Sequence, residues 1–387
     1  MEHRLPPELE DLRGTLRTWV EREYPVTRAQ ELEARTGEFP HELWDDLAQL
    51  GLHAIGIDER YGGSGGDVLT QVVVARELAR TLAGLTWTWG ISSFAGGKSI
   101  GLYGTAEQRE RLLPPLARGE TKVAIAVTEP GGGTDLLGAL RTSATRVDGG
   151  WTLSGQKVWS TAAHVSDHLL VLARSDPSAS RRTRGLTLFL VPQPSPGLVL
   201  RAIPKLGMRS ISSFEVFLDE VFVPDELVLG EPGQAWYHLL GTLNNERIVL
   251  AALCVGILDG VLEEALRYAS ERQVFDRPLG SLQAVQHQLA DVATERKKAE
   301  LLVYDAAWRQ SQGLECGREA NIAKLVASDA ANHAADVGIQ IMGGMGYAME
   351  TPMQRYWRDS RIYRIAPIAN EMVRNILAEG LGLPRSF

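Results

Sequence analysis

Cysteine is scarce in this sequence. Cys254 and Cys316 are its only two cysteines among 387 residues. One pair of thiols cannot build a disulfide-stapled scaffold or a four-thiolate zinc site. Glycine and proline, at 39 and 18 residues, are also too few and too irregularly spaced for a fibrous or disordered chain. A globular protein with a large hydrophobic core remains.

Long hydrophobic runs and an excess of positive charge are missing as well. The longest apolar run covers residues 248–258, about half the roughly 20 residues of a membrane-spanning helix. The net charge of −8 argues against a partner as anionic as nucleic acid. The acidic N-terminus has no apolar signal core, and the C-terminus has no lipidation or peroxisomal signal. We therefore expect a cytoplasmic protein with no nucleic-acid partner and no membrane span.

The hydrophobic pattern divides the chain into three segments. Residues 1–121 show helical spacing of apolar side chains, and residues 122–229 show short β-like runs separated by turn residues. Helical periodicity returns over residues 230–387, where the first helix is apolar nearly all round and so belongs inside a bundle. The sequence therefore predicts an α+β protein. It has an N-terminal helical domain, a central antiparallel β-barrel or sandwich, and a C-terminal four-helix bundle.

Two local motifs do not carry their usual chemistry. Gly97–Ser99 matches the end of a phosphate-binding loop, but Ser92 stands where that loop needs its first glycine. His164, Asp167 and His168 could be a metal trio, yet a β-like period points the aspartate away from the two histidines. No GxGxxG follows a strand, which leaves a nicotinamide site without support. We expect no metal.

A set of separated motifs is more informative because it keeps a fixed order along the whole chain. The motifs are AVTEPGGGTD at 126–135, KVWST at 157–161, KLGMRS at 205–210, RQVF at 272–275 followed by Gln283, and QIMGGMGY at 340–347. In this order they resemble the acyl-CoA dehydrogenase flavoprotein family. The resemblance implies the same helical, β and helical layout that periodicity predicts independently.

The resemblance also implies FAD as the cofactor. Trp159 would cover the flavin ring, the Thr161 hydroxyl would hydrogen-bond flavin N5, and the planar Arg272 guanidinium would meet the pyrophosphate. In the family, Arg272 and the turn at 340–344 serve the FAD of a neighbouring subunit, which implies a homo-oligomer, usually a tetramer. The complete set of cofactor residues implied in this way is Val127, Thr128, Gly133, Thr134, Trp159, Ser160, Thr161, Arg272, Phe275, Gln283, Gln340, Gly343 and Gly344.

The catalytic base of the family is not where most members have it. Most members carry a glutamate near the C-terminus, and Pro367 occupies that position here. The isovaleryl-CoA and long-chain members take their glutamate from the start of the first bundle helix, in a segment similar to residues 243–248. Glu246 is therefore the predicted base, and an apolar wall behind it would raise its pKa. Pro367 also lacks the backbone N–H that would hold the thioester carbonyl. Either the Ile368 amide or a flavin ribityl hydroxyl would replace it.

Each of these residues also has a structural interpretation. Glu246 could be a first-turn glutamate that the helix dipole favours, with Asn244 or Asn245 as the cap. Arg247 could position the carboxylate or the thioester, or it could form a salt bridge within the bundle. By resemblance, Asn244 and Thr134 would contact the substrate, Asn244 at its pantetheine arm.

The predicted function is FAD-dependent α,β-dehydrogenation of an acyl thioester, carried by coenzyme A or by an acyl-carrier protein. A carboxylate removes the C2 proton while a hydride leaves C3 for the flavin. An electron-transfer flavoprotein or O₂ would accept the electrons. Two alternatives remain open, a flavin oxidase or monooxygenase on the same scaffold and a non-enzymatic protein with this fold. The sequence does not identify the acyl chain.

Overall fold

The computed structural model describes residues 5–385, with side-chain detail for all of these except residues 94 and 95. The N-terminal part is helical. Its helices are α1 (Pro7–Glu23), α2 (Val26–Ala34), α3 (His41–Gln49), α4 (Val68–Leu82), α5 (Trp87–Ser92), α6 (Ser99–Tyr103) and α7 (Ala106–Ala117). Local sequence sets some of their starts. Asp67 accepts hydrogen bonds from two first-turn amides of α4, and Thr105 and Gln108 form a capping box on α7.

The middle part is a mixed sheet. Its elements are β1 (Val123–Ala126), the short helix α8 (Leu136–Ala139), β2 (Ser143–Val147), β3 (Gly150–Thr161), β4 (His168–Arg174), β5 (Leu186–Pro192), β6 (Leu198–Ile203), β7 (Ser213–Pro224) and β8 (Val228–Leu229). The strand order is β6-β7-β3-β2-β4-β5-β8, and β1 pairs with β4 in parallel. The sequence predicted an antiparallel barrel or sandwich, and the observed sheet differs from it in two details. Two pairings are parallel, β1 with β4 and β2 with β4. The sheet does not close on itself, because β6 and β8 end the order unpaired with each other.

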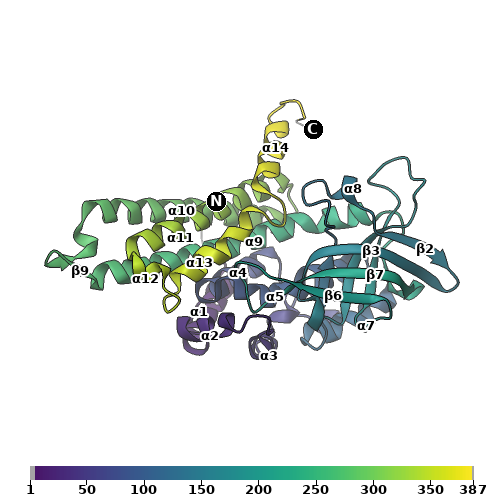
Figure 1. The fold of residues 1–387 in the computed structure, drawn as a ribbon, viewed down its shortest axis with the longest axis horizontal. Helices are drawn as coiled ribbons and strands as arrows, with labels where there is room; N and C mark the ends of the chain where they lie inside the picture. Colours follow the sequence, from purple (N-terminus) through teal and green to yellow (C-terminus); the bar gives the residue numbers. More distant parts are fainter. Residues whose placement is uncertain (1–4, 386–387) are drawn as a thin grey trace.

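The C-terminal part returns to helices. They are α9 (Ala235–Glu271), α10 (Gln283–Ser311), α11 (Gly317–Met342), α12 (Gly344–Tyr347), α13 (Met353–Ser360) and α14 (Asn370–Gly380), with the hairpin β9 (Gln273–Val274) and β10 (Arg277–Pro278) after α9. Figure 1 shows the long helices side by side, the sheet at one end of them and β9 at the other. The α+β layout of helices, sheet and helices is the one predicted. None of the helices within residues 5–385 combines the length and hydropathy that crossing a membrane requires.

The two helical parts share one hydrophobic core. It joins buried side chains of α1–α4 to those of α9–α11, so α4 packs into the C-terminal bundle beside α9 and α10. Gly256 and Gly260 allow this contact, because a Cβ at either position would overlap a backbone carbonyl oxygen of α4. Polar groups cross the same contact. Arg76 of α4 forms a buried ion pair with Asp259 at 2.8 Å and another with Glu300 at 2.9 Å.

A second core fills the sheet. It includes α7 and the first turns of α9, where Ala235 and Leu239 are buried. Helix α9 therefore belongs to both cores, with its beginning against the sheet and its remainder inside the bundle. The residues around 246 lie between these two attachments.

Candidate functional site

Trp159 is turned outward by an irregularity in the sheet. Between Lys157 and Ser160 the pairing of β3 with β7 slips, so that β3 has one residue more than its partner. Trp159 lies in this bulge with a φ of 65°, and its side chain is 53% exposed. Such a bulge re-aims a side chain at the end of a strand. The structure thereby presents a large aromatic surface, which suits the planar ring of a flavin.

Two residues with hydroxyl groups, Ser160 and Thr161, directly follow Trp159 in the chain. The Thr161 hydroxyl lies 3.0 Å from the hydroxyl of Ser213 on β7. Ser160 is fully buried, and its hydroxyl has no hydrogen-bond partner within residues 5–385. Buried polar groups normally have partners, so an unsatisfied hydroxyl beside an exposed ring is a group that a bound polar ligand could satisfy. These observations fit a flavin at the end of β3.

The TEPGGGTD segment runs alongside β3, as the cofactor prediction requires. The Val158 amide donates a 2.8 Å hydrogen bond to the Thr128 carbonyl, which fixes Val127 and Thr128 next to the Trp159 bulge. Gly133 and Thr134 follow on the surface, and both are exposed. Backbone groups there are open to a ligand without a blocking side chain.

A buried ion pair that the cofactor prediction did not include holds this segment. Lys157 is fully buried, and its ammonium lies 2.8 Å from Glu129, which also accepts hydrogen bonds from the Arg141 and Thr142 amides. Burial lowers the pKa of Lys157 to about 8, and Glu129 opposes that shift. Breaking such a pair leaves an uncompensated buried charge, so the segment is firmly anchored. The sequence analysis could have found this pair, because Glu129 and Lys157 both lie within the motifs at 126–135 and 157–161.

Glu246 lies inside α9 and not at its start. The helix begins at Ala235, so Glu246 is about three turns in, and Gln234 occupies the N-cap position. The prediction that Glu246 belongs to a first turn capped by Asn244 or Asn245 was therefore wrong, because α9 extends back to the sheet, where Ala235 and Leu239 are buried. A favourable helix-dipole interaction falls off within the first turn, so it does not explain this glutamate.

The surroundings of Glu246 are poor in hydrogen bonds. Its carboxylate has no hydrogen-bond or ion-pair partner among the described residues. Burial raises its pKa to about 7, and the neighbouring charge of Arg247 acts against that shift. A carboxylate in such surroundings can accept a proton near neutral pH.

The residues beside Glu246 are held in place by polar contacts. Arg247 donates a 3.2 Å hydrogen bond to the Asn244 side chain, and the Arg247 Nε is buried without a partner in the described part of the chain. Burial lowers the pKa of the Arg247 guanidinium. The salt bridge within the bundle that the sequence left open for Arg247 does not occur among the described residues. Asn245 is buried and bonded to Gln71 and Gln310.

Pro367 lies in the loop before α14, and a buried lysine connects that loop to α11. Lys324 donates hydrogen bonds of 2.6 Å to the Ile368 carbonyl and to the Asn370 side chain. Burial lowers the pKa of Lys324 to about 8, and the charge of Arg247 adds to that lowering. The loop with Pro367 and the turn of α9 with Arg247 therefore lie near each other. The sequence analysis gave no role to Lys324, because its partners come from elements far apart in the chain.

The remaining predicted cofactor residues lie at the opposite end of the bundle. Arg272 follows α9, Phe275 is 88% exposed in the β9–β10 hairpin, and Gln283 opens α10. Gln340 and Gly343 end α11, and Gly344 opens α12. Figure 1 shows β9 and α12 at the end of the bundle away from the sheet. Arg272 lies 26 residues beyond Glu246 along α9, which is about 39 Å of helix.

Models of one protein family match almost the entire chain. The acyl-CoA dehydrogenase N-terminal domain matches residues 6–120, the middle domain residues 124–221 and the C-terminal domain residues 233–382. The chain belongs to the acyl-CoA dehydrogenase family. Acyl-CoA dehydrogenases are FAD flavoproteins that oxidise CH–CH groups, and the geometry around Trp159 fits that cofactor.

Individual members of the acyl-CoA dehydrogenase family are similar over nearly their full length. The chain is 38% identical to benzylmalonyl-CoA dehydrogenase of Aromatoleum aromaticum over 90% of each protein. It is 34% identical to an acyl-CoA dehydrogenase of Bacillus subtilis, over 96% of this chain and 97% of that protein. Among solved structures, butyryl-CoA dehydrogenase of Megasphaera elsdenii superimposes with a TM-score of 0.92 at 32% identity, covering 99% of this chain and 100% of that one.

Proposed function

We propose that this acyl-CoA dehydrogenase oxidises an acyl thioester to its 2,3-enoyl form and that Glu246 is the base. The observation that carries the assignment of the base is the unpaired Glu246 carboxylate with a pKa of about 7. A general base works best when its pKa lies near the operating pH, because it is then both ionised and basic enough. Exposed Glu371, in the first turn of α14, has no comparable burial.

Proton removal at C2 leaves negative charge on the thioester carbonyl, which needs donors. Pro367 offers no N–H, but the Ile368 amide next to it has no acceptor among the described residues. We propose that the Ile368 N–H holds the carbonyl oxygen and that Lys324, bonded to the Ile368 carbonyl at 2.6 Å, keeps this peptide in place. Arg247 and Asn244, bonded to each other, would orient the thioester and its pantetheine arm.

FAD, when bound, supplies the acceptor for the hydride that leaves C3. Residues of two kinds would hold it. Trp159, Ser160 and Thr161 would meet the ring, and Val127, Thr128, Gly133 and Thr134 would present hydroxyl and backbone groups to the polar part of the cofactor. The Thr161 hydroxyl, which lies 3.0 Å from the Ser213 hydroxyl, would donate to N5.

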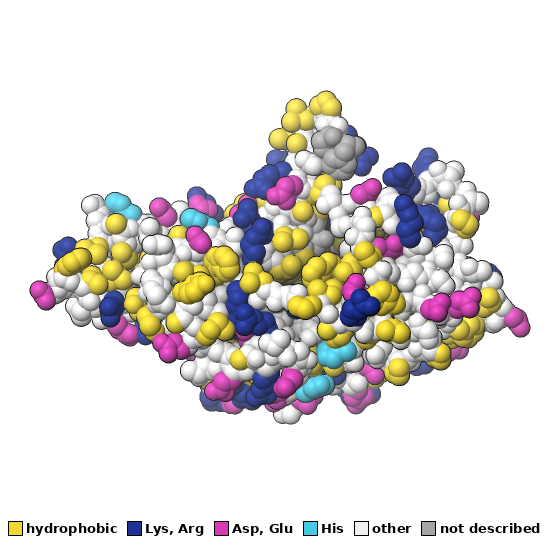
Figure 2. All heavy atoms as spheres, viewed as in Figure 1, with side chains coloured by type: hydrophobic (Ala, Val, Ile, Leu, Met, Phe, Trp, Pro, Cys, Tyr) yellow, Lys and Arg dark blue, Asp and Glu magenta, His cyan; other side chains and the backbone are white. Residues whose placement is uncertain are grey.

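We propose that the remaining FAD residues come from a second copy of the chain. About 39 Å of helix separates Arg272 from Glu246, so Arg272 cannot complete the site of its own chain. Phe275 and Tyr347, at 88% and 81% exposure, are open to a partner at that end of the bundle, where Figure 2 shows hydrophobic side chains gathered. We propose a homo-oligomer, most simply a tetramer, in which Arg272, Phe275, Gln283, Gln340, Gly343 and Gly344 of one copy meet the FAD of another.

Anaerobic flavin reduction tests this function. Purified holoprotein is mixed with a panel of acyl-CoA thioesters, and loss of the oxidised-flavin absorbance is followed by stopped flow. Glu246→Gln should bind substrate yet reduce its flavin about 10²-fold more slowly, the scale of a lost general base. Glu371→Gln is the matched control and should reduce at the wild-type rate. If Glu246→Gln reduces its flavin at the wild-type rate and Glu371→Gln reduces it slowly, the base is Glu371 of α14.

The electron acceptor is tested on the same protein. Reduced enzyme is exposed either to O₂ or to an electron-transfer flavoprotein, and the return of the flavin absorbance is timed. Fast reoxidation by the flavoprotein and slow reoxidation by O₂ support a dehydrogenase. The reverse result would make the enzyme an oxidase. A pantetheine thioester on an acyl-carrier protein, compared with the same acyl group on coenzyme A, identifies the carrier.

A further inference from the structure

Ser213 is the first residue of β7 and lies directly opposite Thr161, the last residue of β3. The two residues are a cross-strand pair, and their hydroxyl oxygens lie 3.0 Å apart. Ser213 is only 4% exposed, whereas Thr161 is half-buried and follows the exposed Trp159 by two residues. The pair therefore combines a buried hydroxyl with a hydroxyl at the proposed flavin site.

The Ser213 hydroxyl has no backbone acceptor among the described residues. β7 lies between β3 and β6, and residue 213 pairs with residue 161 on one side and with residue 203 on the other. The backbone carbonyls of a strand that is paired on both sides are engaged in hydrogen bonds to the neighbouring strands. In the part of the chain that the structure describes, Thr161 is the one hydrogen-bond partner of the Ser213 side chain.

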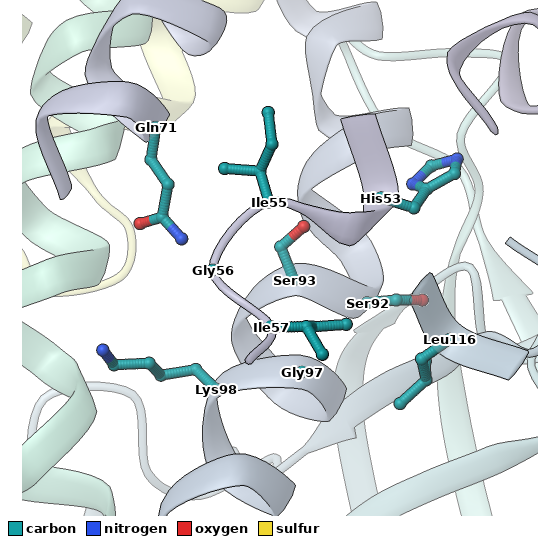
Figure 3. A pocket seen from close by; sticks show the side chains of 10 residues that line it. All are labelled: His53, Ile55, Gly56, Ile57, Gln71, Ser92, Ser93, Gly97, Lys98 and Leu116. Atoms are coloured by element: carbon teal, nitrogen blue, oxygen red, sulfur yellow. The ribbon is translucent and has the colours of Figure 1, made fainter. Parts of the chain in front are cut away.

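Hydroxyl side chains on helices and turns of this chain find their acceptors locally. Ser93, which Figure 3 shows on its helical turn, donates a 3.1 Å hydrogen bond to the Trp89 carbonyl four residues earlier. Ser166 donates in the same way to the Ala162 carbonyl, at 3.0 Å. A helix or turn brings such a carbonyl within reach of the side chain, and a strand does not. Ser213 therefore depends on Thr161.

The number of donors and acceptors fixes the direction of this hydrogen bond. If Thr161 donated to Ser213, the buried Ser213 proton would have no acceptor among the described residues, at a cost of about 1–3 kcal/mol. If Ser213 donates, the Thr161 oxygen accepts and the Thr161 proton remains unused. The other acceptor near that proton is the Trp159 carbonyl at 3.5 Å, which is too far for a good hydrogen bond. Donation by Ser213 thus leaves the Thr161 proton to a ligand.

Backbone contacts hold the two hydroxyls in register. The Ala162 amide donates a 2.8 Å hydrogen bond to the Ser212 carbonyl, directly beside the pair. The pairing of β3 with β7 slips at the Trp159 bulge and is regular again where Thr161 meets Ser213. The position of the Thr161 side chain next to the bulge is therefore set by β7.

We propose that Ser213 is a positioning residue that donates to Thr161 and thereby directs the Thr161 proton to N5 of the flavin. The inference rests on the proposed function, because it assumes that N5 lies beside Thr161. N5 of oxidised flavin carries a lone pair and needs a donor. A hydroxyl that already accepts one hydrogen bond is both oriented and polarised for donation. Ser213 acts through Thr161.

Two cofactors that differ only at position 5 of the ring test this assignment. FAD has a nitrogen acceptor there, and 5-deaza-FAD has a C–H group that accepts no hydrogen bond. Apoprotein is titrated with each cofactor, and the dissociation constants are measured by calorimetry. We expect wild type to bind FAD about tenfold more tightly than 5-deaza-FAD, the scale of one hydrogen bond. Thr161→Val should remove this preference.

Substitutions at Ser213 then measure its contribution. Ser213→Ala removes the donor that orients Thr161, so the preference for FAD should fall to about threefold or less. Ser213→Thr keeps a hydroxyl and should retain the preference. Ser175→Ala is the matched control, because Ser175 and Thr187 form another hydroxyl pair of the same sheet, with their oxygens 2.6 Å apart. A purely structural role of Ser213 would weaken the binding of both cofactors by the same factor.

The outcomes separate this inference from the proposed function. If no acyl thioester reduces the wild-type flavin, the proposed dehydrogenation fails, and the two cofactors still decide the role of Ser213. Equal affinities of wild type for FAD and 5-deaza-FAD would overturn the inference, and so would an unchanged preference in Ser213→Ala. If Ser213→Ala does not fold, Ser213→Cys decides in its place. Its S–H group is a weak donor of similar size, so the preference should again be smaller than in wild type.

Discussion

Asn245 donates a 2.8 Å hydrogen bond through its side-chain amide to Oε1 of Gln71, and this bond joins α9 to α4 one residue before Glu246. The Asn245 oxygen accepts a second hydrogen bond, 2.9 Å long, from Gln310 of α10. Two helices, α4 and α10, therefore fix the rotation of α9 at the point where the proposed base projects. Side-chain contacts of this kind orient a reacting group more accurately than the helix backbone alone.

Asn245→Ala should reveal this positioning role. The substitution removes the partner of the Gln71 oxygen, which is buried, and of the Gln310 amide, which is half-buried. An unsatisfied buried polar group costs about 1–3 kcal/mol, and a half-buried one costs less. We expect a lower free energy of unfolding in urea and a slower flavin reduction at saturating substrate. Unchanged reduction rates in a destabilised protein would limit Asn245 to a structural role.

The rate of flavin reduction should depend on pH through Glu246. Its pKa of about 7 means that the base is mostly protonated below neutral pH and ionised above it. The rate should therefore rise with pH through an apparent pKa of about 7 and reach a plateau. Stopped-flow reduction between about pH 5.5 and pH 9 measures the profile. A rate that is flat across this range would be incompatible with Glu246 as the titrating base.

Glu246 should also make stability depend on pH. Its folded-state pKa of about 7 lies above the ordinary value of 4.5, so the folded protein binds more protons than the unfolded chain between these values. Stability therefore falls as pH rises through this window. Near the acidic end of this pH window, Glu246→Gln should have the same free energy of unfolding as wild type. Above neutral pH its free energy of unfolding should be higher than that of wild type, by up to about 3 kcal/mol. Urea unfolding at both ends of the window tests this, with Glu371→Gln as the control.

Gly256 should tolerate no side chain. A Cβ there would overlap the Arg76 carbonyl oxygen and lie 2.7 Å from the Ala79 methyl carbon of α4. Gly256→Ala must push two helices apart, so we expect a loss of about 1–3 kcal/mol in the free energy of unfolding. Gly14 of α1 is the control, because nothing lies within 4 Å of its added Cβ. Gly14→Ala should instead stabilise the protein by about 0.5–1 kcal/mol. Equal effects at both positions would contradict the close helix contact.

Arg272→Ala should weaken FAD retention and the oligomer together. The guanidinium is exposed at the end of α9, far from the Trp159 site of its own chain, so its loss acts on the partner's cofactor in the proposed assembly. Sizing chromatography with flavin absorbance measures both properties. Arg267→Ala, which removes an exposed arginine one turn earlier, is the control. A monomer that keeps FAD tightly would contradict the shared site.

Much of the fold was accessible from local sequence. The change from helical to alternating hydrophobic periodicity and back predicted three parts, because side-chain period follows directly from backbone geometry. The ordered motifs identified the family, and they also predicted the flavin residues and Glu246. Local sequence did not predict that the sheet stays open, and it did not predict that α9 begins before residue 246. Parallel pairing of β1 with β4 joins residues over 40 positions apart, and α9 begins early because its first turns pack on the sheet.

What only the tertiary structure decided is which charges have partners. Lys98, Lys157 and Lys324 look alike in the sequence. In the fold, Glu129 lies beside Lys157 and the loop before α14 lies beside Lys324, but no hydrogen-bond acceptor among the described residues lies beside Lys98. The sequence determined that the chain is a flavin-binding acyl-CoA dehydrogenase, since those residues act through local motifs. The separation of Arg272 from Glu246 and the unpaired Lys98 depend on contacts between distant segments, and such contacts exist only in the packed chain.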